Sequence, residues 1–323
     1  MTTPTVPLFL DCDTGVDDAL ALTYLLDVPH VDLVGIGTVS GNTDAATAAV
    51  NTAALLALCG RTVPVAVGAH DPIGGSYGGG APHVHGANGI GGVDLPPGVA
   101  AAEDPAAELL VRLARDHAAG DRKLDVLAIG PLTNLAVALE AEPRLPELVG
   151  TVTIMGGAVW DAGNVSPTAE ANVHNDAEAA RRVLRAGFDL VLVPLDVTRQ
   201  HRFDDADADR FTAAGDPLRV ALGTMLRSYV DFYESVDHVR RAPLHDPLAA
   251  AIAAGEVEPA VRTTPLDVVV GGAEHGRTVP AADGPAVRVV VTADDRAADV
   301  IRERILHVGT VSSGSVGRDG VGR

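Results

Sequence analysis

The segment Val6–Asp27, VPLFLDCDTGVDDALALTYLLD, joins an apolar run to an Ala- and Leu-rich stretch through four aspartates. Val6 to Leu10 has the composition of a buried strand, and Asp17 to Asp27 has the composition of a helix. A strand followed directly by a helix is the first half of a βαβ unit, whose strands lie parallel in one sheet. The segment therefore predicts an α/β fold.

The same alternation of strand-like and helix-like segments continues toward the C-terminus. Apolar runs predict further strands at Val31 to Val39, Val63 to Val67, Leu124 to Ile129, Val152 to Met155, Leu190 to Val193, Leu266 to Val270 and Val287 to Val291. Ala- and Leu-rich stretches predict helices at Thr43 to Cys59, Pro105 to Ala118, Leu132 to Leu139, Asp176 to Arg185, Asp204 to Arg241 and Ala297 to Leu306. We expect an open, mostly parallel central sheet flanked by helices.

The chain shows neither an internal repeat nor a linker that divides it, so residues 1–323 are expected to form a single domain. Its Gly-, Ser- and Val-rich end predicts a disordered tail from about residue 310. Asp71 to Gly98 and Gly156 to Asn175 are predicted to be long loops. Loops of that length in a compact protein often carry function.

A second acidic run, Asp204, Asp205, Asp207 and Asp209, opens one of the predicted helices. Aspartate is common at helix starts because its side chain caps free N–H groups and its charge suits the helix dipole. A metal site is the alternative interpretation. We expect capping.

The chain of 323 residues carries a formal charge of −19, from 43 acidic and 24 basic residues. Such a field repels phosphate backbones and anionic lipid, so nucleic acid and membrane are not expected as partners. Lys123 is the single lysine, so a phosphorylated ligand would depend on arginine or backbone amides. Two cysteines and the lack of a leader-like N-terminus predict a cytoplasmic protein without a disulfide framework.

Four carboxylates, at Asp11, Asp13, Asp17 and Asp18, crowd the junction between the first strand and the first helix. Their repulsion becomes tolerable around a hard cation, because Ca²⁺ and Mg²⁺ prefer oxygen ligands and Gly15 permits a tight turn. Ligands of open α/β sheets also bind at the carboxyl ends of strands. Helix capping is the alternative, but it explains only Asp17 and Asp18.

The segment LDCDTGVDDA, Leu10 to Ala19, resembles the N-terminal signature of the inosine-uridine-preferring nucleoside hydrolase family. The family's other active-site segments resemble, in the same order, Val39 to Asn42 (VSGN), His85 to Gly89 (HGANG), Gly163 to Asn172 (GNVSPTAEAN) and His245 to Pro247 (HDP). The resemblance spans residues 5 to about 250. It implies the nucleoside hydrolase fold with its Rossmann-like core, and hydrolysis of ribonucleosides to base and ribose for purine or pyrimidine salvage.

The resemblance also implies a bound calcium ion. Asp13, Asp18 and Asp246 match the family's carboxylate ligands, and Thr133 matches the residue whose backbone carbonyl binds the metal. Asp13 also matches the general base that takes a proton from the metal-bound water, because the cation lowers the pKa of that water. His245 matches the general acid that protonates the departing base, a role suited to an ordinary histidine pKa of about 6.5.

Further positions match the family's substrate contacts. Those implied at the ribose are Asp17, Asn42 and Asn172 around the 2′ and 3′ hydroxyls, with Asn164 and Glu170 around the 5′ hydroxyl. Hydrogen bonds that strengthen as the sugar becomes an oxocarbenium ion lower the barrier. His85, Tyr229 and Tyr233 match positions near the base, and the tyrosines share a helix face because they are four residues apart. Core packing is the alternative for the tyrosines, and Asx turns are the alternative for the loop asparagines.

Two positions depart from the family's pattern. Ala171 stands where relatives commonly have Phe, which removes an apolar surface beneath the sugar. Thr14 stands where many relatives have Pro, a change expected to affect loop stiffness more than chemistry. Neither change removes a catalytic group, although the first bears on ribose affinity.

The residues leave two other functions open. A Mg²⁺-dependent phosphatase would use an Asp-rich strand end, but it needs cationic side chains for the phosphate, and the matched segments contain none. A non-catalytic nucleoside-binding protein of the same fold could well have lost a catalytic group, whereas Asp13 and His245 are both present. Members of the family are usually homodimers or homotetramers, and we expect the same here.

Overall fold

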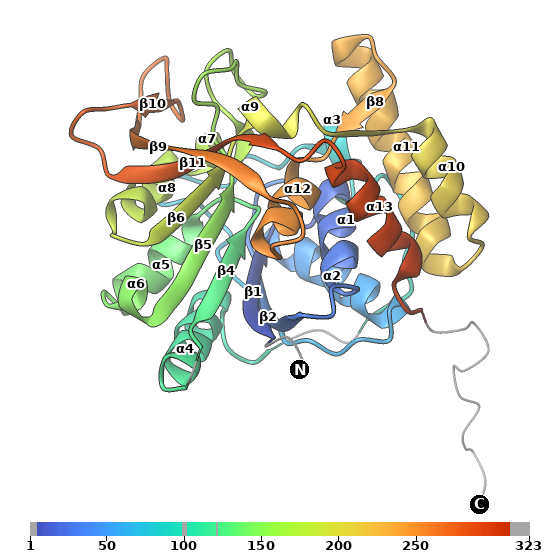
Figure 1. The fold of residues 1–323 in the computed structure, drawn as a ribbon, viewed down its shortest axis with the longest axis horizontal. Coiled ribbons are helices and arrows are strands. Elements are labelled where there is room, and N and C mark those ends of the chain that lie inside the picture. Colours follow the sequence, from blue (N-terminus) through green and yellow to red (C-terminus); the bar gives the residue numbers. More distant parts are fainter. Residues whose placement is uncertain (1–4, 99–101, 121, 311–323) are drawn as a thin grey trace, which may run out of the picture.

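The computed structural model describes residues 5–98, 102–120 and 122–310, and its centre is a nine-stranded sheet (Figure 1). The sheet comprises β1 (Val6–Cys12), β2 (Val31–Thr38), β3 (Val65–Val67), β4 (Leu124–Ala128), β5 (Val149–Met155), β6 (Asp189–Val193), β9 (Pro259–Val268), β10 (Thr278–Pro280) and β11 (Ala286–Ala293). Its order is β10-β9-β11-β6-β5-β4-β1-β2-β3. Only β9 runs antiparallel to its neighbours. The predicted open, mostly parallel sheet is confirmed.

Strand β1 lies inside the sheet, between β2 and β4. Six of its seven residues are buried, as expected of a parallel strand covered on both faces. From β1 the chain moves outward through β2 and β3, and then returns to β4 on the other side. This reversal leaves a crevice at the carboxyl ends of β1 and β4, where ligands of open α/β sheets bind.

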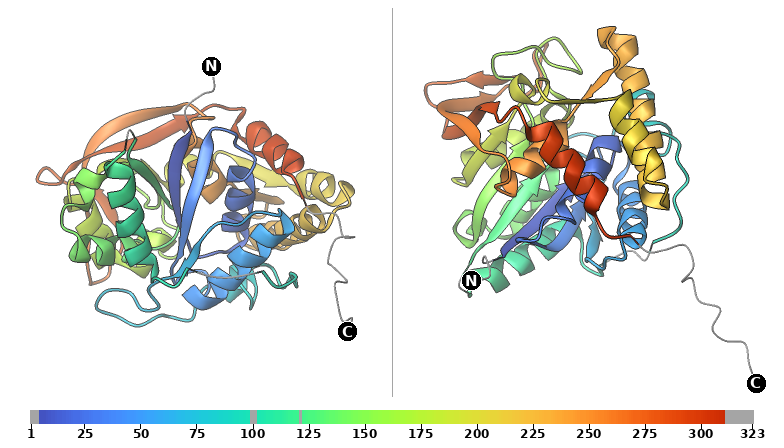
Figure 2. Two further views of the ribbon diagram at one scale, coloured as in Figure 1. Left: turned by 90° about the horizontal axis from the view of Figure 1, so that it is seen from below. Right: turned by 45° about the vertical axis from the view of Figure 1, so that its right-hand side comes forward.

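Helices cover both faces of the sheet (Figure 2). One face carries α1 (Val16–Leu25), α2 (Ala45–Leu58), α11 (Pro217–Asp237), α12 (His245–Ala253) and α13 (Ala297–His307). The other face carries α4 (Ala106–Ala118), α5 (Thr133–Ala141), α6 (Leu145–Leu148) and α8 (Ala177–Arg185). All ten residues of α1 are buried, because the helix contacts α11, α12 and α13 as well as lying against the sheet. Both aspartates of its first turn are therefore buried.

The prediction of one helix from Asp204 to Arg241 is wrong. The segment forms β7 (Arg202–Asp204), α10 (Asp205–Ala213), α11 and β8 (Arg241–Pro243). Helix α10 ends at Ala213, and Gly215 follows with a left-handed φ of +79°. The Asp216 side chain then caps α11 by accepting from the Arg219 N–H. Asp204 likewise caps α10 by accepting from two backbone N–H groups, so the capping interpretation of the acidic run is confirmed.

Short helices interrupt the predicted loops. They are α3 (Pro82–His85), α7 (Ala171–Asn175) and, after β6, α9 (Leu195–Thr198). Four or five residues form about one helical turn, too short for an apolar period to be read from the sequence. The predicted disordered tail lies largely outside the described residues, which end at residue 310.

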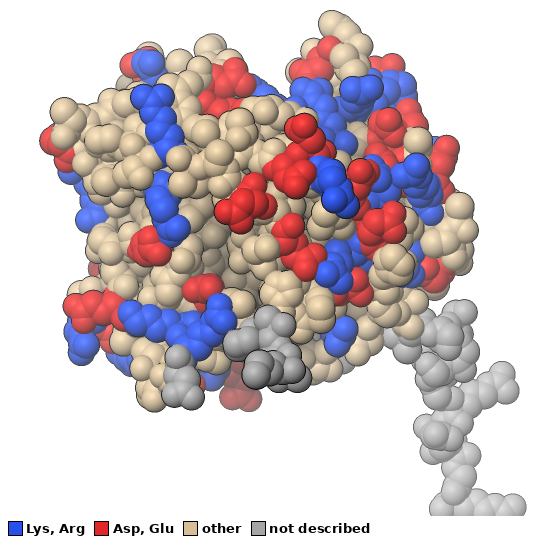
Figure 3. Space-filling view, viewed as in Figure 1, with Lys and Arg blue, Asp and Glu red and all other residues tan. Residues whose placement is uncertain are grey.

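Acidic and basic side chains are interspersed over α10, α11 and α13 (Figure 3). Arg240, for example, forms ion pairs with Asp205 of α10 and with Asp231 of α11. On the opposite side of the molecule, Arg181 and Arg185 of α8 both bind Asp267 of β9. Among the described helices, none is long and apolar enough to cross a membrane.

Candidate active site

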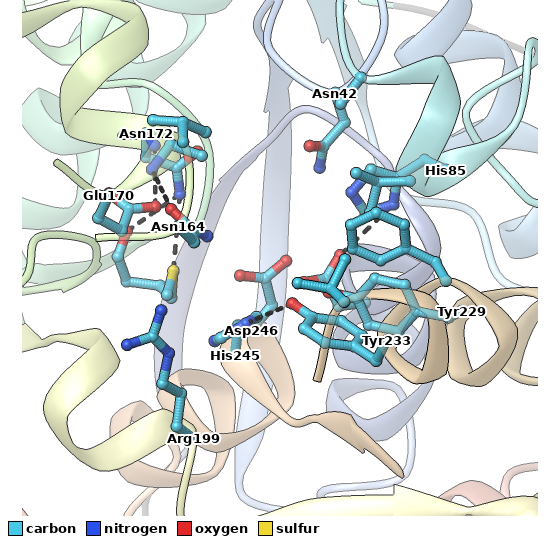
Figure 4. A pocket seen from close by; sticks show the side chains of 18 of the residues that line it. Asn42, His85, Asn164, Glu170, Asn172, Arg199, Tyr229, Tyr233, His245 and Asp246 are labelled. Carbon is cyan, nitrogen blue, oxygen red and sulfur yellow. Dashed lines mark hydrogen bonds and ion pairs between the residues drawn. The ribbon is translucent and has the colours of Figure 1, made fainter. Parts of the chain in front are cut away.

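Loops at the carboxyl ends of the parallel strands surround a cavity of about 330 Å³ (Figure 4). That volume is in the range of small-molecule sites. Ten of the expected site residues line it: Asp17, Asn42, His85, Asn164, Glu170, Asn172, Tyr229, Tyr233, His245 and Asp246. The remaining three, Asp13, Asp18 and Thr133, are buried and do not line the cavity. Residues more than 200 positions apart in the sequence thus meet at one edge of the sheet.

Three carboxylates form a buried cluster at the cavity floor. One oxygen from each of Asp17, Asp18 and Asp246 lies within 4.8 Å of the others. The Asp13 N–H donates to Asp18 Oδ1 at 3.1 Å, and the Gly15 N–H donates to Asp18 Oδ2 at 2.8 Å. These bonds fix Asp18 against the turn that follows β1.

Asp13 is fully buried and is held by Asn42. The Asn42 N–H donates to Asp13 Oδ2 at 2.6 Å, and the Asn42 amide nitrogen Nδ2 donates to Asp13 Oδ1 at 3.2 Å. The same Nδ2 lies 3.2 Å from Asp18 Oδ2. Asn42 therefore links the turns after β1 and β2 and orients two of the expected metal ligands.

The electrostatics of the cluster suit a cation. Burial, followed by repulsion from neighbouring carboxylates, raises the pKa of Asp13 and Asp246 well above the ordinary range and raises that of Asp18 to about 7. In addition, Asp17 Oδ1 is buried without a hydrogen-bond partner. A hard divalent cation binds oxygen ligands, and it would neutralise the repulsion among these crowded, buried carboxylates.

Asp11 belongs to a layer behind this cluster. The Asn134 amide nitrogen donates to Asp11 Oδ1 at 2.7 Å and to the Thr38 carbonyl at 2.9 Å. Burial raises the pKa of Asp11 to about 7. Asp11 thus ties β1 to β2 and to the start of α5, and it supports the turn that carries Asp13.

Gly15 is required by the close packing of this turn. A Cβ atom at Gly15 would lie 2.6 Å from Asn42 Nδ2 and 2.8 Å from His85 Nδ1. His85 Nδ1 accepts the Val16 N–H at 3.1 Å, so the neutral ring carries its proton on Nε2. Burial lowers the pKa of His85 and keeps the ring neutral. His85 both lines the cavity and closes the N-terminus of α1.

The two tyrosines of α11 share one face, as predicted, with ring centroids 5.0 Å apart. Tyr229 is 2% exposed, and its hydroxyl donates to Asp17 Oδ2 at 3.0 Å. The Tyr233 hydroxyl lies 2.9 Å from His245 Nε2. Tyr229 thus orients a carboxylate of the floor, whereas Tyr233 contacts the expected general acid.

His245 begins α12 and is held at both ring nitrogens. The Thr198 hydroxyl, at the end of α9, lies 2.7 Å from Nδ1, on the side of the ring away from Tyr233. Both His245 and Thr198 are buried. Burial lowers the pKa of His245 to about 4, so the ring is neutral near pH 7.

The segment from the end of β5 to the first turn of α7 supplies three polar side chains, Asn164, Glu170 and Asn172, to the opposite wall. Asn172 Nδ2 donates to the carbonyls of Ile129 and Met155, which leaves its Oδ1 for a ligand. Asn164 Oδ1 accepts the Ala171 N–H at 3.0 Å. These bonds connect residues seven or more apart, so they differ from the local Asx turns considered above.

Glu170 caps α7. Its Oε1 accepts the Asn172 N–H at 2.8 Å, and its Oε2 accepts the N–H groups of Gly157 and Val173 at 2.9 and 3.0 Å. Both carboxylate oxygens are thus engaged by the backbone. Glu170 lines the cavity, but its charge is used largely to hold the loop.

Among the lining residues that the sequence did not predict are Arg199, Phe232 and His83. The Arg199 guanidinium donates to the carbonyls of Ala162 and Gly163 at 2.8 and 2.9 Å, so it binds the loop after β5 to α9. Phe232 precedes Tyr233 on α11 and packs edge-to-face against His83, with centroids 6.0 Å apart. The aromatic run of α11 was an available signal for Phe232, whereas the sequence carried none for Arg199.

An acidic floor, amide-bearing walls and a fixed histidine define a site for a neutral, hydroxyl-rich ligand. A model of the inosine-uridine preferring nucleoside hydrolase family matches residues 8–299, and the chain belongs to this family. It is therefore an enzyme of the nucleoside hydrolase class, which acts on ribonucleosides.

Individual relatives agree with this class. The chain is 34% identical to uridine nucleosidase 1 of Arabidopsis thaliana over 244 residues, 75% of this chain and 72% of that protein. It is 35% identical to the pyrimidine-specific ribonucleoside hydrolase RihA of Enterobacter sp. strain 638 over 249 residues, which are 76% and 78% of the two chains.

Solved structures agree as well. A plant nucleoside hydrolase, PpNRh1, superposes with a TM-score of 0.89 at 28% identity, covering 94% of this chain and 100% of that one. The purine-preferring ribonucleoside hydrolase of Gardnerella vaginalis superposes with a TM-score of 0.87 at 29% identity, covering 94% and 98%. These comparisons confirm the predicted family, fold class and enzyme class.

Proposed function

We propose that this enzyme is a calcium-dependent ribonucleoside hydrolase in which Asp13 is the general base and His245 is the general acid. The observation that carries the proposal is a group of buried carboxylates beside a histidine fixed at both ring nitrogens. In this group an oxygen of Asp18 lies within 4.8 Å of one of Asp246, and Asp18 shares the Asn42 amide nitrogen with Asp13. Hydrolysis of an N-glycosidic bond needs an activated water on one side of the sugar and a proton for the base on the other. The cavity offers His245 for the second task, and Asp13, buried next to the lining residue Asn42, is suited to the first.

In this proposal the calcium ion would be held by Asp13, Asp18, Asp246 and the Thr133 carbonyl. A calcium ion there supplies Lewis acidity that makes a bound water easier to deprotonate. Asp13 then accepts the proton of the attacking water, and its hydrogen bonds from Asn42 keep the carboxylate in one orientation. Burial and the neighbouring carboxylates raise the pKa of Asp13 in the absence of a cation, and a bound cation would oppose this shift and keep the carboxylate ionised, able to accept the proton.

His245 delivers a proton to the departing base. In the resting enzyme the ring is neutral, because burial lowers its pKa to about 4. As negative charge develops on the base, His245 takes up a proton from solvent, and Nε2 passes it to the departing base. The proton that Asp13 accepts from water returns to solvent, so both groups end in their starting states. Tyr233 and Thr198, which contact Nε2 and Nδ1, hold the ring in the required position.

The ribose hydroxyls are bound by Asp17, Asn42 and Asn172 around the 2′ and 3′ positions, and by Asn164 and Glu170 around the 5′ position. Asp17 supports this role, since its Oδ1 is free and Tyr229 orients its Oδ2. His85, Tyr229 and Tyr233 form the neighbouring wall of the cavity, where we place the base. Hydrogen bonds that tighten as the sugar flattens lower the barrier.

The test is a comparison of Asp13→Asn and His245→Ala on a natural nucleoside and on 4-nitrophenyl β-D-ribofuranoside, whose leaving group needs no proton. Asp13→Asn should lose about 10²- to 10⁴-fold in kcat on both substrates, as expected for a lost general base. His245→Ala should lose a similar factor on the nucleoside only. Asp116→Ala, at an exposed position on α4, is the matched control.

Wild-type turnover in Asp13→Asn would show that another group is the base. An equal loss on both substrates in His245→Ala would show that His245 is not the acid. Calcium titration by calorimetry adds a readout independent of turnover, since Asp13→Asn should also bind the ion more weakly.

A further inference from the structure

A second cavity, also about 330 Å³, adjoins the first. The two cavities share five lining residues, Asn42, Ala81, His83, Val165 and Ala171. The second cavity extends between the loop that follows β3 and the segment around α7. The shared residues place the two cavities side by side.

The second cavity is polar but carries no formal charge. Its lining includes residues with hydroxyl, amide or imidazole side chains, among them Ser40, Ser76, Tyr77, Thr133, His174 and Asn175. Among the described residues that line it there is no Asp, Glu, Lys or Arg. Groups of this kind suit a neutral ligand that both donates and accepts hydrogen bonds, and they lack the cations needed to neutralise a phosphate.

Ala171 forms the junction between the cavities. It lies between Glu170 and Asn172, and its N–H is fixed to Asn164 Oδ1. Its side chain is a single methyl group, and the residue lines both spaces. A large side chain at this position would occupy the passage beside Asn164 and Glu170.

The hydrogen bonds of Glu170 affect which groups on the 5′ carbon this wall can tolerate. Three backbone N–H groups already engage its two carboxylate oxygens. A 5′ hydroxyl at this wall can donate to Glu170 only through the remaining lone pair of Oε1. Because backbone N–H groups already bind both oxygens, replacing that hydroxyl with an ether leaves no buried charge unpaired. The wall tolerates substitution at the 5′ carbon better than a dedicated acceptor would.

We propose that the enzyme also hydrolyses ribonucleosides that carry a neutral, polar substituent on the 5′ carbon, with the substituent in the second cavity. This inference rests on the proposed function, which puts the 5′ end of the ribose beside Asn164 and Glu170. Substrates with a 5′ phosphate are excluded by the lack of cations in the second cavity and by the net charge of −19.

The test uses three substrates with the same base: the best nucleoside of the enzyme, its 5′-O-(2-hydroxyethyl) ether and its 5′-monophosphate. We expect kcat/KM of the ether to lie within about tenfold of the parent value, and that of the monophosphate to fall at least about 100-fold. A loss of more than about 100-fold for the ether in the wild-type enzyme overturns the proposal.

The variant Ala171→Phe closes the passage. The ratio of kcat/KM for the ether to that for the parent nucleoside should fall by about 100-fold, whereas Ala171→Val should lower it by a smaller factor. The matched control is Ala162→Phe, an exposed position of the same loop that lines neither cavity, which should leave the ratio unchanged.

An unchanged ratio in folded Ala171→Phe contradicts the placement of the substituent. If the wild-type enzyme releases no base from the parent nucleoside, the proposed function itself has failed. If it cleaves the parent but not the ether, only the inference about the second cavity has failed.

Discussion

Replacement of Thr198 by valine tests the proposed positioning of the general acid. The Thr198 hydroxyl lies 2.7 Å from His245 Nδ1, and both residues are buried. Valine keeps the shape of threonine but leaves Nδ1 without its partner. An unsatisfied buried group costs about 1–3 kcal/mol. If that cost falls on the transition state, kcat for a nucleoside drops about 5- to 150-fold.

The assay compares kcat for the nucleoside with kcat for 4-nitrophenyl β-D-ribofuranoside. Thr198→Val should lose activity on the nucleoside only, because the nitrophenolate leaves without a proton. Thr198→Ser keeps a hydroxyl at the same place and should recover most of the rate. Equal losses on both substrates in Thr198→Val, with an unchanged melting temperature, would refute the reasoning.

Three further perturbations test the surrounding structure. Tyr229→Phe removes the 3.0 Å bond to Asp17, so kcat/KM for nucleosides should fall about tenfold while the melting temperature changes little; an unchanged kcat/KM contradicts this role. Gly15→Ala puts a Cβ 2.6 Å from Asn42 Nδ2, and calorimetric unfolding should show a loss of about 1–3 kcal/mol, whereas wild-type stability would show that the turn can relax. Hydrogen bonds from Arg185 and Arg181 hold the pKa of Asp267 at about 2, below its ordinary value of 3.8. These bonds therefore stabilise the folded protein fully above about pH 4, and their contribution is lost as the pH falls toward 2. The melting temperature of Asp267→Asn should therefore lie below that of wild type at pH 7 and approach it below pH 4, and a pH-independent difference would exclude this linkage.

The sheet could be predicted because its buried strands are continuous apolar runs. Strand β1 and the Asp-rich turn after it form one short segment, which indicates both a βαβ fold and a site at the end of the strand. The junction of α10 and α11 was misjudged although Gly215, Asp216 and Pro217 are all helix-boundary residues. Single-turn helices such as α7 and α9 depend on tertiary contacts, and these have no sequence period.

Site residues that lie in short sequence motifs could be predicted, whereas contacts that depend on how distant segments pack could not. The ten expected residues that line the cavity were identified through the family resemblance, eight of them within its short motifs, whereas helix spacing predicted only that Tyr229 and Tyr233 share a face. By contrast, the contact of Thr198 with His245 requires α9 to pack against the start of α12, which no spacing in the sequence reveals. The capping role of Glu170 likewise depends on how the loop folds over Gly157.

The most direct test of the central claim is a measurement of free ribose released from inosine, uridine, adenosine, guanosine and cytidine by chelator-treated enzyme, before and after addition of calcium. We predict that at least one nucleoside yields ribose and free base in equal amounts, that chelation abolishes the release, and that calcium restores it. Release that persists in the chelator would contradict the calcium-dependent mechanism. Tight nucleoside binding by calorimetry without any release would instead identify a binding protein of the same fold.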